Sequence, residues 1–160
     1  MRRKDREIKE KTEIIEVMRN CDICRLGLID GEYAYILPLN FGMEVSEEGK
    51  VTLYFHSALA GHKVELLKDG GKASFEMDTR HELEYDEEKG DCTFYFESVM
   101  GKGTIHILEE EEKFEALRRL MDHYHPGMNA YFNPAAIPRT LVYTLEVEEM
   151  TGKRKMPKHM

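Results

Sequence analysis

The sequence predicts a mainly β protein, in which an antiparallel sheet with Greek-key-like connections closes into a barrel with flanking helices. At least six segments alternate apolar and polar residues with the two-residue period of half-buried strands. Turn signals such as Asp30-Gly31 separate strands, and no regular β-α-β alternation, G-x-G-x-x-G motif or P-loop motif is present. The 160 residues can bury one core, so we expect a single domain over residues 1–160.

Composition and charge exclude several classes of partner. Hydrophobic residues make up 41% of the chain and charged residues 34%, a balance typical of soluble globular proteins. The net charge of −8 argues against nucleic acid, whose phosphates require a basic surface. No apolar run is long enough to span a membrane and no signal-peptide pattern is recognisable, so we expect a cytoplasmic protein without a membrane partner.

The three cysteines predict free thiols rather than a disulfide framework. Cys21 and Cys24 form a C-x-x-C pair, but no second pair completes a zinc site. The pair precedes an apolar run instead of a helix, which is not the position of a thioredoxin-like motif. We interpret it as two thiols at the start of a strand.

The first elements are a helix and a hairpin. Residues 10–19 place an apolar stripe on one helical face. Residues 24–29 and 33–39 read as two strands joined by Asp30-Gly31. Pro38 cannot donate to a sheet ladder, so we expect the second strand to fray or bulge there.

The middle of the chain continues the strand pattern. In residues 51–56 the apolar positions alternate with polar ones, so His56 faces away from the apolar side. A helix over residues 61–68 ends before Gly70-Gly71. Residues 72–78 alternate again, whereas the acidic residues 82–89 read as a solvated loop or hairpin end.

The last third predicts a long strand, a helix and a final strand. Residues 93–108 suffice for one bent strand or two, and Gly101 and Gly103 indicate a bulge or a close backbone approach. Four acids at residues 109–112 begin a helix, since the helix dipole favours them there. Its predicted apolar face consists of Phe114, Leu117, Leu120 and Met121. Residues 125–138, with three prolines, read as a loop, and residues 141–147 form the clearest strand.

Residues 51–63 carry the chemistry that stands out most. A strand ends in His56-Ser57, and a turn of small residues leads to a helix with Lys63 in its first turn. An imidazole, a hydroxyl, a lysine and the free N–H groups of a helix start suit a phosphate monoester. His123 and His125 could ligate a metal, but the sequence places no third ligand, and we interpret them as a pair that interacts with a helix C-terminus.

Six segments in order resemble one protein family. They are MRRKDREI, CRLGLIDGEYAYILPLNFG, LYFHSALAGHK, SVMGKGTIHIL, EEKFEALRRLMDHY and RTLVYTLEVEEMTGK. The chain resembles the pyridoxamine 5′-phosphate oxidase-like family of FMN-binding split barrels, and more narrowly its nitroimidazole-resistance branch.

The resemblance implies a homodimer with FMN at the subunit interface. It implies that Pro38, Leu39, Asn40 and Phe41 lie along the isoalloxazine ring, and that His56, Ser57, His62 and Lys63 surround the phosphate. Ser98 and Val99, in the segment 98–101, would approach the flavin, and which subunit supplies them is left open. Two positions depart from the family pattern. His62 stands where a lysine or arginine is frequent, which makes this cation titratable, and Ala34 replaces a usual proline.

The resemblance implies a flavin-dependent reductase that passes electrons from a reduced nicotinamide or another small donor to a small oxidised acceptor, such as a nitroaromatic or a quinone. No side chain stands out as a general acid or a nucleophile, which fits chemistry performed by a cofactor. Pyridoxamine 5′-phosphate oxidation is one alternative, but it requires a second, arginine-rich phosphate site, and the arginines do not cluster. A non-enzymatic flavin- or haem-binding protein is another.

Overall fold

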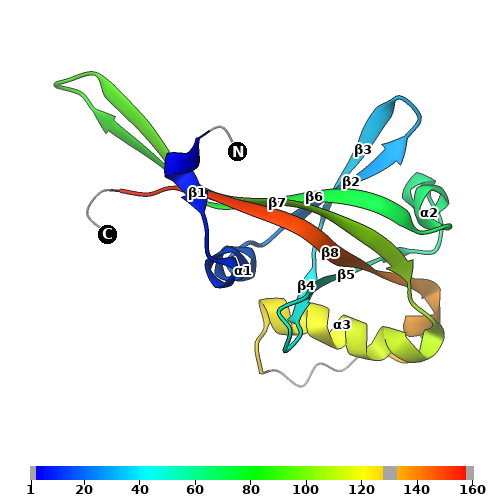
Figure 1. Ribbon diagram of the computed structural model, residues 1–160. Helices are drawn as coiled ribbons and strands as arrows, with labels where there is room; N and C mark the ends of the chain where they lie inside the picture. The colour runs from blue at the N-terminus through cyan, green and yellow to red at the C-terminus, as the bar shows by residue number, and fades with distance from the viewer. Residues whose placement is uncertain (1–2, 128–132, 158–160) are drawn as a thin grey trace.

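A computed structural model describes residues 3–127 and 133–157 as one antiparallel sheet with flanking helices (Figure 1). The first half contains η1 (Lys4–Arg6), β1 (Glu7–Ile8), α1 (Lys11–Arg19), β2 (Cys24–Asp30), β3 (Tyr33–Leu39), β4 (Gly42–Val45), β5 (Val51–Ala58) and α2 (His62–Leu67). The second half contains β6 (Gly71–Asp86), β7 (Asp91–Ile107), α3 (Glu110–Tyr124), η2 (Ile137–Arg139) and β8 (Thr140–Lys155). The described helices include none that is long and apolar enough to cross a bilayer.

The sheet curls into a split barrel. Its strand order is β3-β2-β6-β7-β8-β5-β4, with β1 paired to β8. The edge strands β3 and β4 follow each other in the chain, so residues 40–41 connect the two ends of the sheet without a ladder between them. The predicted antiparallel class with flanking helices is confirmed.

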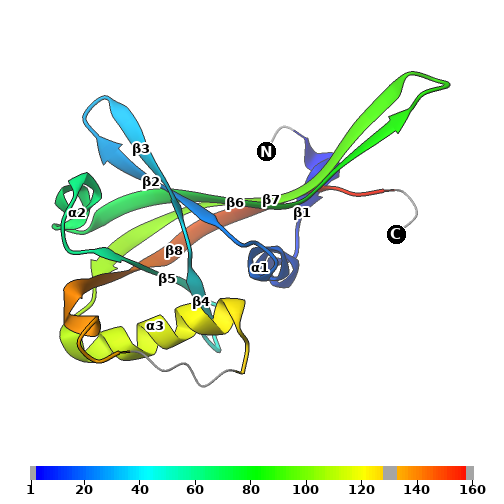
Figure 2. The same cartoon turned by 180° about the vertical axis from the view of Figure 1, so that it is seen from behind.

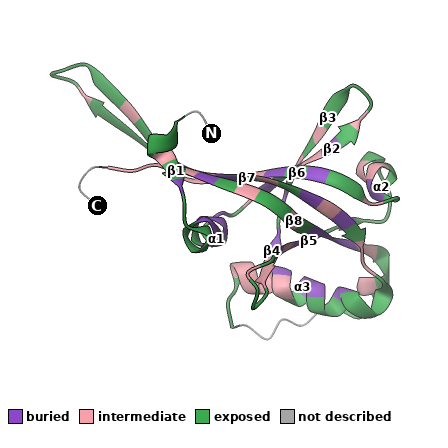
Figure 3. Ribbon diagram, in the orientation of Figure 1, coloured by how far each residue is buried: buried purple, intermediate pink, exposed green. Residues whose placement is uncertain are grey.

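Alternate side chains of the strands form the core. Leu26, Leu53, Phe55 and Leu145 are fully buried, and each contributes roughly 1.5–3 kcal/mol relative to an exposed position. Helix α1 adds its stripe of Ile14, Ile15, Val17 and Met18 to the same cluster, as the burial colours in Figure 3 show. Helix α3 lies across β4 and β5 on the other side of the sheet (Figure 2).

Two expectations from the sequence require correction, and a third is decided between its alternatives. Pro38 causes no bulge: it pairs with Arg25 in a continuous register, because β3 is an edge strand whose ladder can lack one donor. Of the two alternatives for residues 82–89, the structure shows the hairpin end: β6 runs to Asp86 and pairs with β7 as a two-stranded arm that projects from the body (Figure 1). Phe114 is 45% exposed, and α3 buries Lys113, Ala116, Leu117 and Leu120 instead.

The glycines of β7 mark a close backbone approach, as predicted. A Cβ on Gly103 would lie 2.0 Å from the carbonyl oxygen of Glu146, and the pairing of β7 with β8 shifts register between Lys102 and Gly103. The long segment is therefore one strand with a bulge in its ladder.

We expect Gly103→Ala to destabilise the protein by about 3 kcal/mol, because the added methyl group must push β8 away. Gly27→Ala is the matched control, since its Cβ would lie 3.6 Å from the carbonyl oxygen of Ser74, an ordinary contact. Urea unfolding of both variants measures the difference. Equal stability of the two variants would show that the two strands can separate without cost.

Candidate functional site

Strand β5 presents His56 on the face opposite the core. Val51, Leu53 and Phe55 are buried, and His56 on the alternate parity is exposed. The ladder between β4 and β5 ends at the pair of Gly42 with Tyr54. Asn40 and His56 each lie two positions beyond that pair, at the same end of the ladder.

Lys63 and His56 form the electrostatic centre of this region. Burial lowers the pKa of His56 from its usual value, and the positive charge of Lys63 lowers it further. His56 is therefore a neutral hydrogen-bonding group at pH 7. Lys63 is half-buried and has no hydrogen-bond or ion-pair partner within residues 3–127 and 133–157, so its charge is available to an anion.

His62 points to the β2–β3 hairpin. Its Nε2 lies 2.7 Å from Asp30 Oδ2, and its ring meets the ring of Tyr35 edge-on, with centroids 5.1 Å apart. The hydrogen bond and the charge of Asp30 raise the pKa of His62 above its usual value. Sequence reasoning missed Asp30 and Tyr35. Tyr35 shares its strand face with Leu37 and Leu39, whereas Asp30 reads only as a turn residue.

The Ser57 hydroxyl is less accessible to a phosphate than the sequence suggests. It is 8% exposed, and its hydroxyl donates to the carbonyl oxygen of Ala58 at 3.0 Å. Strand parity places Ser57 and His56 on opposite faces of β5. Helix α2 has only six residues, so its backbone adds less positive potential than the predicted helix would.

The end of α3 anchors the connection between β3 and β4. The N–H of Phe41 donates to Tyr124 Oη at 3.1 Å, and that hydroxyl donates to the carbonyl oxygen of Asp22 at 2.7 Å. Leu39 and Phe41 are buried, whereas Pro38 and Asn40 are exposed. Of the predicted side chains at residues 38–41, only Pro38 and Asn40 are therefore accessible to a ligand.

His123 of α3 has structural contacts. His123 Nε2 lies 2.8 Å from the carbonyl oxygen of Cys21, and its ring centroid lies 4.2 Å from that of Phe41. Across the described part of the chain, no three or more His, Cys, Asp or Glu side chains are grouped so as to hold a metal ion. Burial raises the pKa of Cys21 to about 12 and also raises that of Cys24, so both thiols stay protonated.

Ser98 and Val99 lie far from this site within one chain. On β8, His56 pairs with Val142 and Ser98 pairs with Lys153, eleven residues further along. At about 3.3 Å per residue, the two positions are roughly 35 Å apart. Val99 is fully buried, so its side chain cannot touch a ligand. One flavin mononucleotide cannot bridge His56 and Ser98 of the same subunit.

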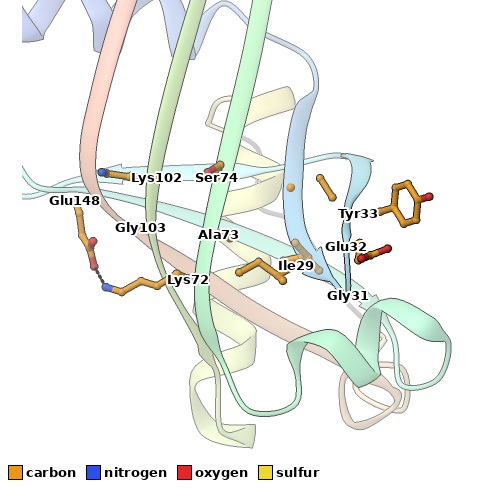
Figure 4. A pocket seen from close by; sticks show the side chains of 13 residues that line it. Ile29, Gly31, Glu32, Tyr33, Lys72, Ala73, Ser74, Lys102, Gly103 and Glu148 are labelled. Carbon is orange, nitrogen blue, oxygen red and sulfur yellow. Dashed lines mark hydrogen bonds and ion pairs between the residues drawn. The ribbon is translucent and has the colours of Figure 1, made fainter.

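A shallow depression of about 630 Å³ lies elsewhere, on the sheet surface formed by β2, β6 and β7 (Figure 4). Small residues such as Gly27, Ala73 and Gly103 line it, and Lys72 forms an ion pair with Glu148 at its edge. It contains none of the residues predicted to bind flavin. We therefore locate the candidate site from the side-chain chemistry around His56 and Lys63, not from the size of this depression.

Comparisons with known proteins identify the family of the chain. The family model described as pyridoxamine 5′-phosphate oxidase matches residues 10–154. No curated protein sequence matches the chain. The solved structure of a candidate 5-nitroimidazole antibiotic resistance protein from Bacteroides thetaiotaomicron is 30% identical, with a TM-score of 0.78 over 92% of this chain and 86% of that chain.

Two more distant structures share the fold. The FAD and haem binding protein from Mycobacterium smegmatis is 16% identical, with a TM-score of 0.79 over 95% of this chain and 74% of that chain. The flavocytochrome Anf3 from Azotobacter vinelandii is 19% identical, with a TM-score of 0.77 over 98% of this chain and 72% of that chain. At these identities the likeness concerns the fold alone.

Proposed function

The chain belongs to the pyridoxamine 5′-phosphate oxidase family, and on that premise we propose that it binds FMN at the interface of a homodimer and reduces small oxidised acceptors. The observation that carries the proposal is Lys63, a half-buried cation without a partner among the described residues, next to a neutral His56. A phosphate monoester is the anion that best matches one fixed charge and one hydrogen-bond donor.

In this proposal each group has a defined role. Lys63 supplies charge to the phosphate, and His56 donates a hydrogen bond. Ser57 joins them only if its hydroxyl turns away from the carbonyl oxygen of Ala58. The backbone of residues 38–41 and the amide of Asn40 meet the polar edge of the ring system, because an amide both donates and accepts. FMN, when bound, supplies the hydride and electron chemistry, while these residues bind and orient it.

The distance between the two proposed halves of the site supports a homodimer. Since Ser98 lies roughly 35 Å from His56 in one chain, Ser98 can contact the same flavin only from a second subunit. Such a dimer requires a face that can meet its own copy.

The outer face of β2, β3, β6 and β7 suits that contact. Every second residue of β7 points away from the core, namely the even-numbered residues from Cys92 to His106. Their cross-strand partners on β6 point the same way. Nine large apolar side chains are exposed within the described residues, and six belong to this outer face: Ile29, Ile36, Leu83, Tyr85, Phe94 and Met100. Exposed large apolar side chains on one face of a sheet are compatible with a protein interface.

The absorption spectrum of the purified protein tests the proposed function. We expect the two bands of oxidised flavin, which bleach when a reduced nicotinamide is added and return with a nitroaromatic or quinone acceptor. A haem Soret band without flavin bands would replace the proposal with a haem-binding role. A spectrum with no cofactor, together with no FMN uptake in titration, would refute flavin binding.

We expect His56→Ala to lower FMN occupancy while the turnover rate per bound flavin falls by less than about tenfold. The reason is that His56 contacts the phosphate end in this proposal, whereas a general acid–base group contributes about 10²- to 10⁴-fold. Steady-state rates divided by flavin content measure the effect. A thousandfold loss per bound flavin would identify His56 as a proton donor to the acceptor.

A further inference from the structure

The two histidines beside Lys63 differ in their partners. Partial desolvation and the positive charge of Lys63 lower the pKa of His56, so it is neutral at pH 7. His62, one residue before Lys63, faces the carboxylate of Asp30 across 2.7 Å. Only one of the two imidazoles therefore sits where a proton is stabilised.

The hydrogen bond to Asp30 fixes which nitrogen of His62 remains available. Asp30 occupies Nε2, and the edge-on ring of Tyr35 restricts rotation of the imidazole. The acid nearest to Nδ1 is Glu65, at 3.6 Å, beyond hydrogen-bond length, and its side chain is 79% exposed. When the ring is protonated, Nδ1–H is a second donor that an anion beside Lys63 can accept from.

We propose that Asp30 is a positioning residue, which orients His62 and stabilises its protonated form, so that His62 can add a second positive charge to that of Lys63 at the phosphate end of the site. The inference rests on the proposed binding of FMN. It assigns a function to a turn residue of the β2–β3 hairpin that would not itself touch the ligand. The charged and titratable groups that face His62 are Asp30 and Tyr35 from the hairpin, and Glu65 and Lys63 from α2.

The arrangement predicts the direction of a pH effect. A histidine whose pKa is raised by folding is protonated below its folded pKa and loses its charge as the pH rises through that value. Asp30 raises the pKa of His62 above the usual 6.5, so the second cation persists to a higher pH than an isolated histidine would allow. The FMN phosphate is mostly dianionic above about pH 6, so affinity should decline only when His62 deprotonates.

The first test needs no flavin. NMR titration of the His62 ring compares the wild type with Asp30→Asn, and Glu65→Gln is the matched control because it changes the other neighbouring acid. We expect the pKa of His62 to fall to its ordinary range in Asp30→Asn and to remain raised in Glu65→Gln. A pKa of His62 that is unchanged in Asp30→Asn would overturn the inference.

The second test measures the dissociation constant of FMN against pH by flavin fluorescence. At neutral pH we expect Asp30→Asn to weaken binding by about three- to tenfold, less than the loss of a whole charge-assisted hydrogen bond, because the variant keeps the His62 ring and removes only the group that stabilises its charge. As the pH rises, the affinity of Asp30→Asn for FMN should begin to fall at a lower pH than that of the wild type. His62→Gln should bind FMN weakly, and its affinity should show no step in the pH range where His62 titrates in the wild type. Equal affinities at every pH would overturn the role of Asp30 and leave the FMN site intact. If the wild type binds no FMN, the proposed function fails and this inference fails with it.

Discussion

Replacing Lys63 with alanine is expected to weaken FMN binding by about ten- to a hundredfold. Hydrogen bonds to charged groups contribute roughly 1.5–3 kcal/mol, and this lysine has no partner within the described residues that would compete for it. Its removal therefore takes away the largest charge in the phosphate end of the site. Fluorescence titration of the apoprotein with FMN measures the change.

The matched control is Lys68→Ala, which removes an exposed lysine at the other end of the same short helix. Both variants lose one positive charge, so a long-range effect of net charge would weaken binding equally. We expect near wild-type affinity for Lys68→Ala. Unchanged affinity in Lys63→Ala would place the phosphate elsewhere.

The double variant Ile36→Lys with Met100→Lys is expected to dissociate the dimer and release its flavin. Both side chains are more than half exposed in the single chain, so charge there should leave the subunit folded. Each subunit would bury both against its copy, and burial of an aliphatic side chain contributes roughly 1.5–3 kcal/mol. We expect the dimer dissociation constant to rise by at least about a hundredfold.

Phe114→Lys serves as the control, because Phe114 is also exposed but lies on α3, which packs against β4 and β5. Analytical ultracentrifugation over a range of concentrations, with circular dichroism to verify folding, separates the outcomes. A folded double variant that remains dimeric would exclude the outer face of β2, β3, β6 and β7 as the interface.

Local patterns predicted much of the fold. The alternation of residues 51–56 correctly predicted that His56 lies on the exposed face of its strand. This prediction is reliable because side chains alternate between the two faces of any strand. Asp30-Gly31 likewise predicted the hairpin that β2 and β3 form. The projecting arm was left open between a loop and a hairpin end, because its acidic residues are typical of both, and only the pairing of β6 with β7 shows the hairpin.

The candidate site was less predictable because its contacts cross the chain. Asp30 and His62 are 32 residues apart, and no periodicity connects a turn residue to a helix that forms later. Ser57 was assigned to the phosphate with His56, although consecutive strand residues point to opposite faces. The distance between Ser98 and His56 follows only from the pairing of their strands, β7 and β5, with β8.

Sedimentation velocity recorded at both protein and flavin wavelengths tests the central claim most directly. The account predicts that FMN sediments only with the dimer, with one flavin per subunit, and that dilution below the dimer dissociation constant releases flavin together with monomer. Flavin that sediments with the monomer would contradict a site shared between subunits, and so would a dimer that saturates with one flavin.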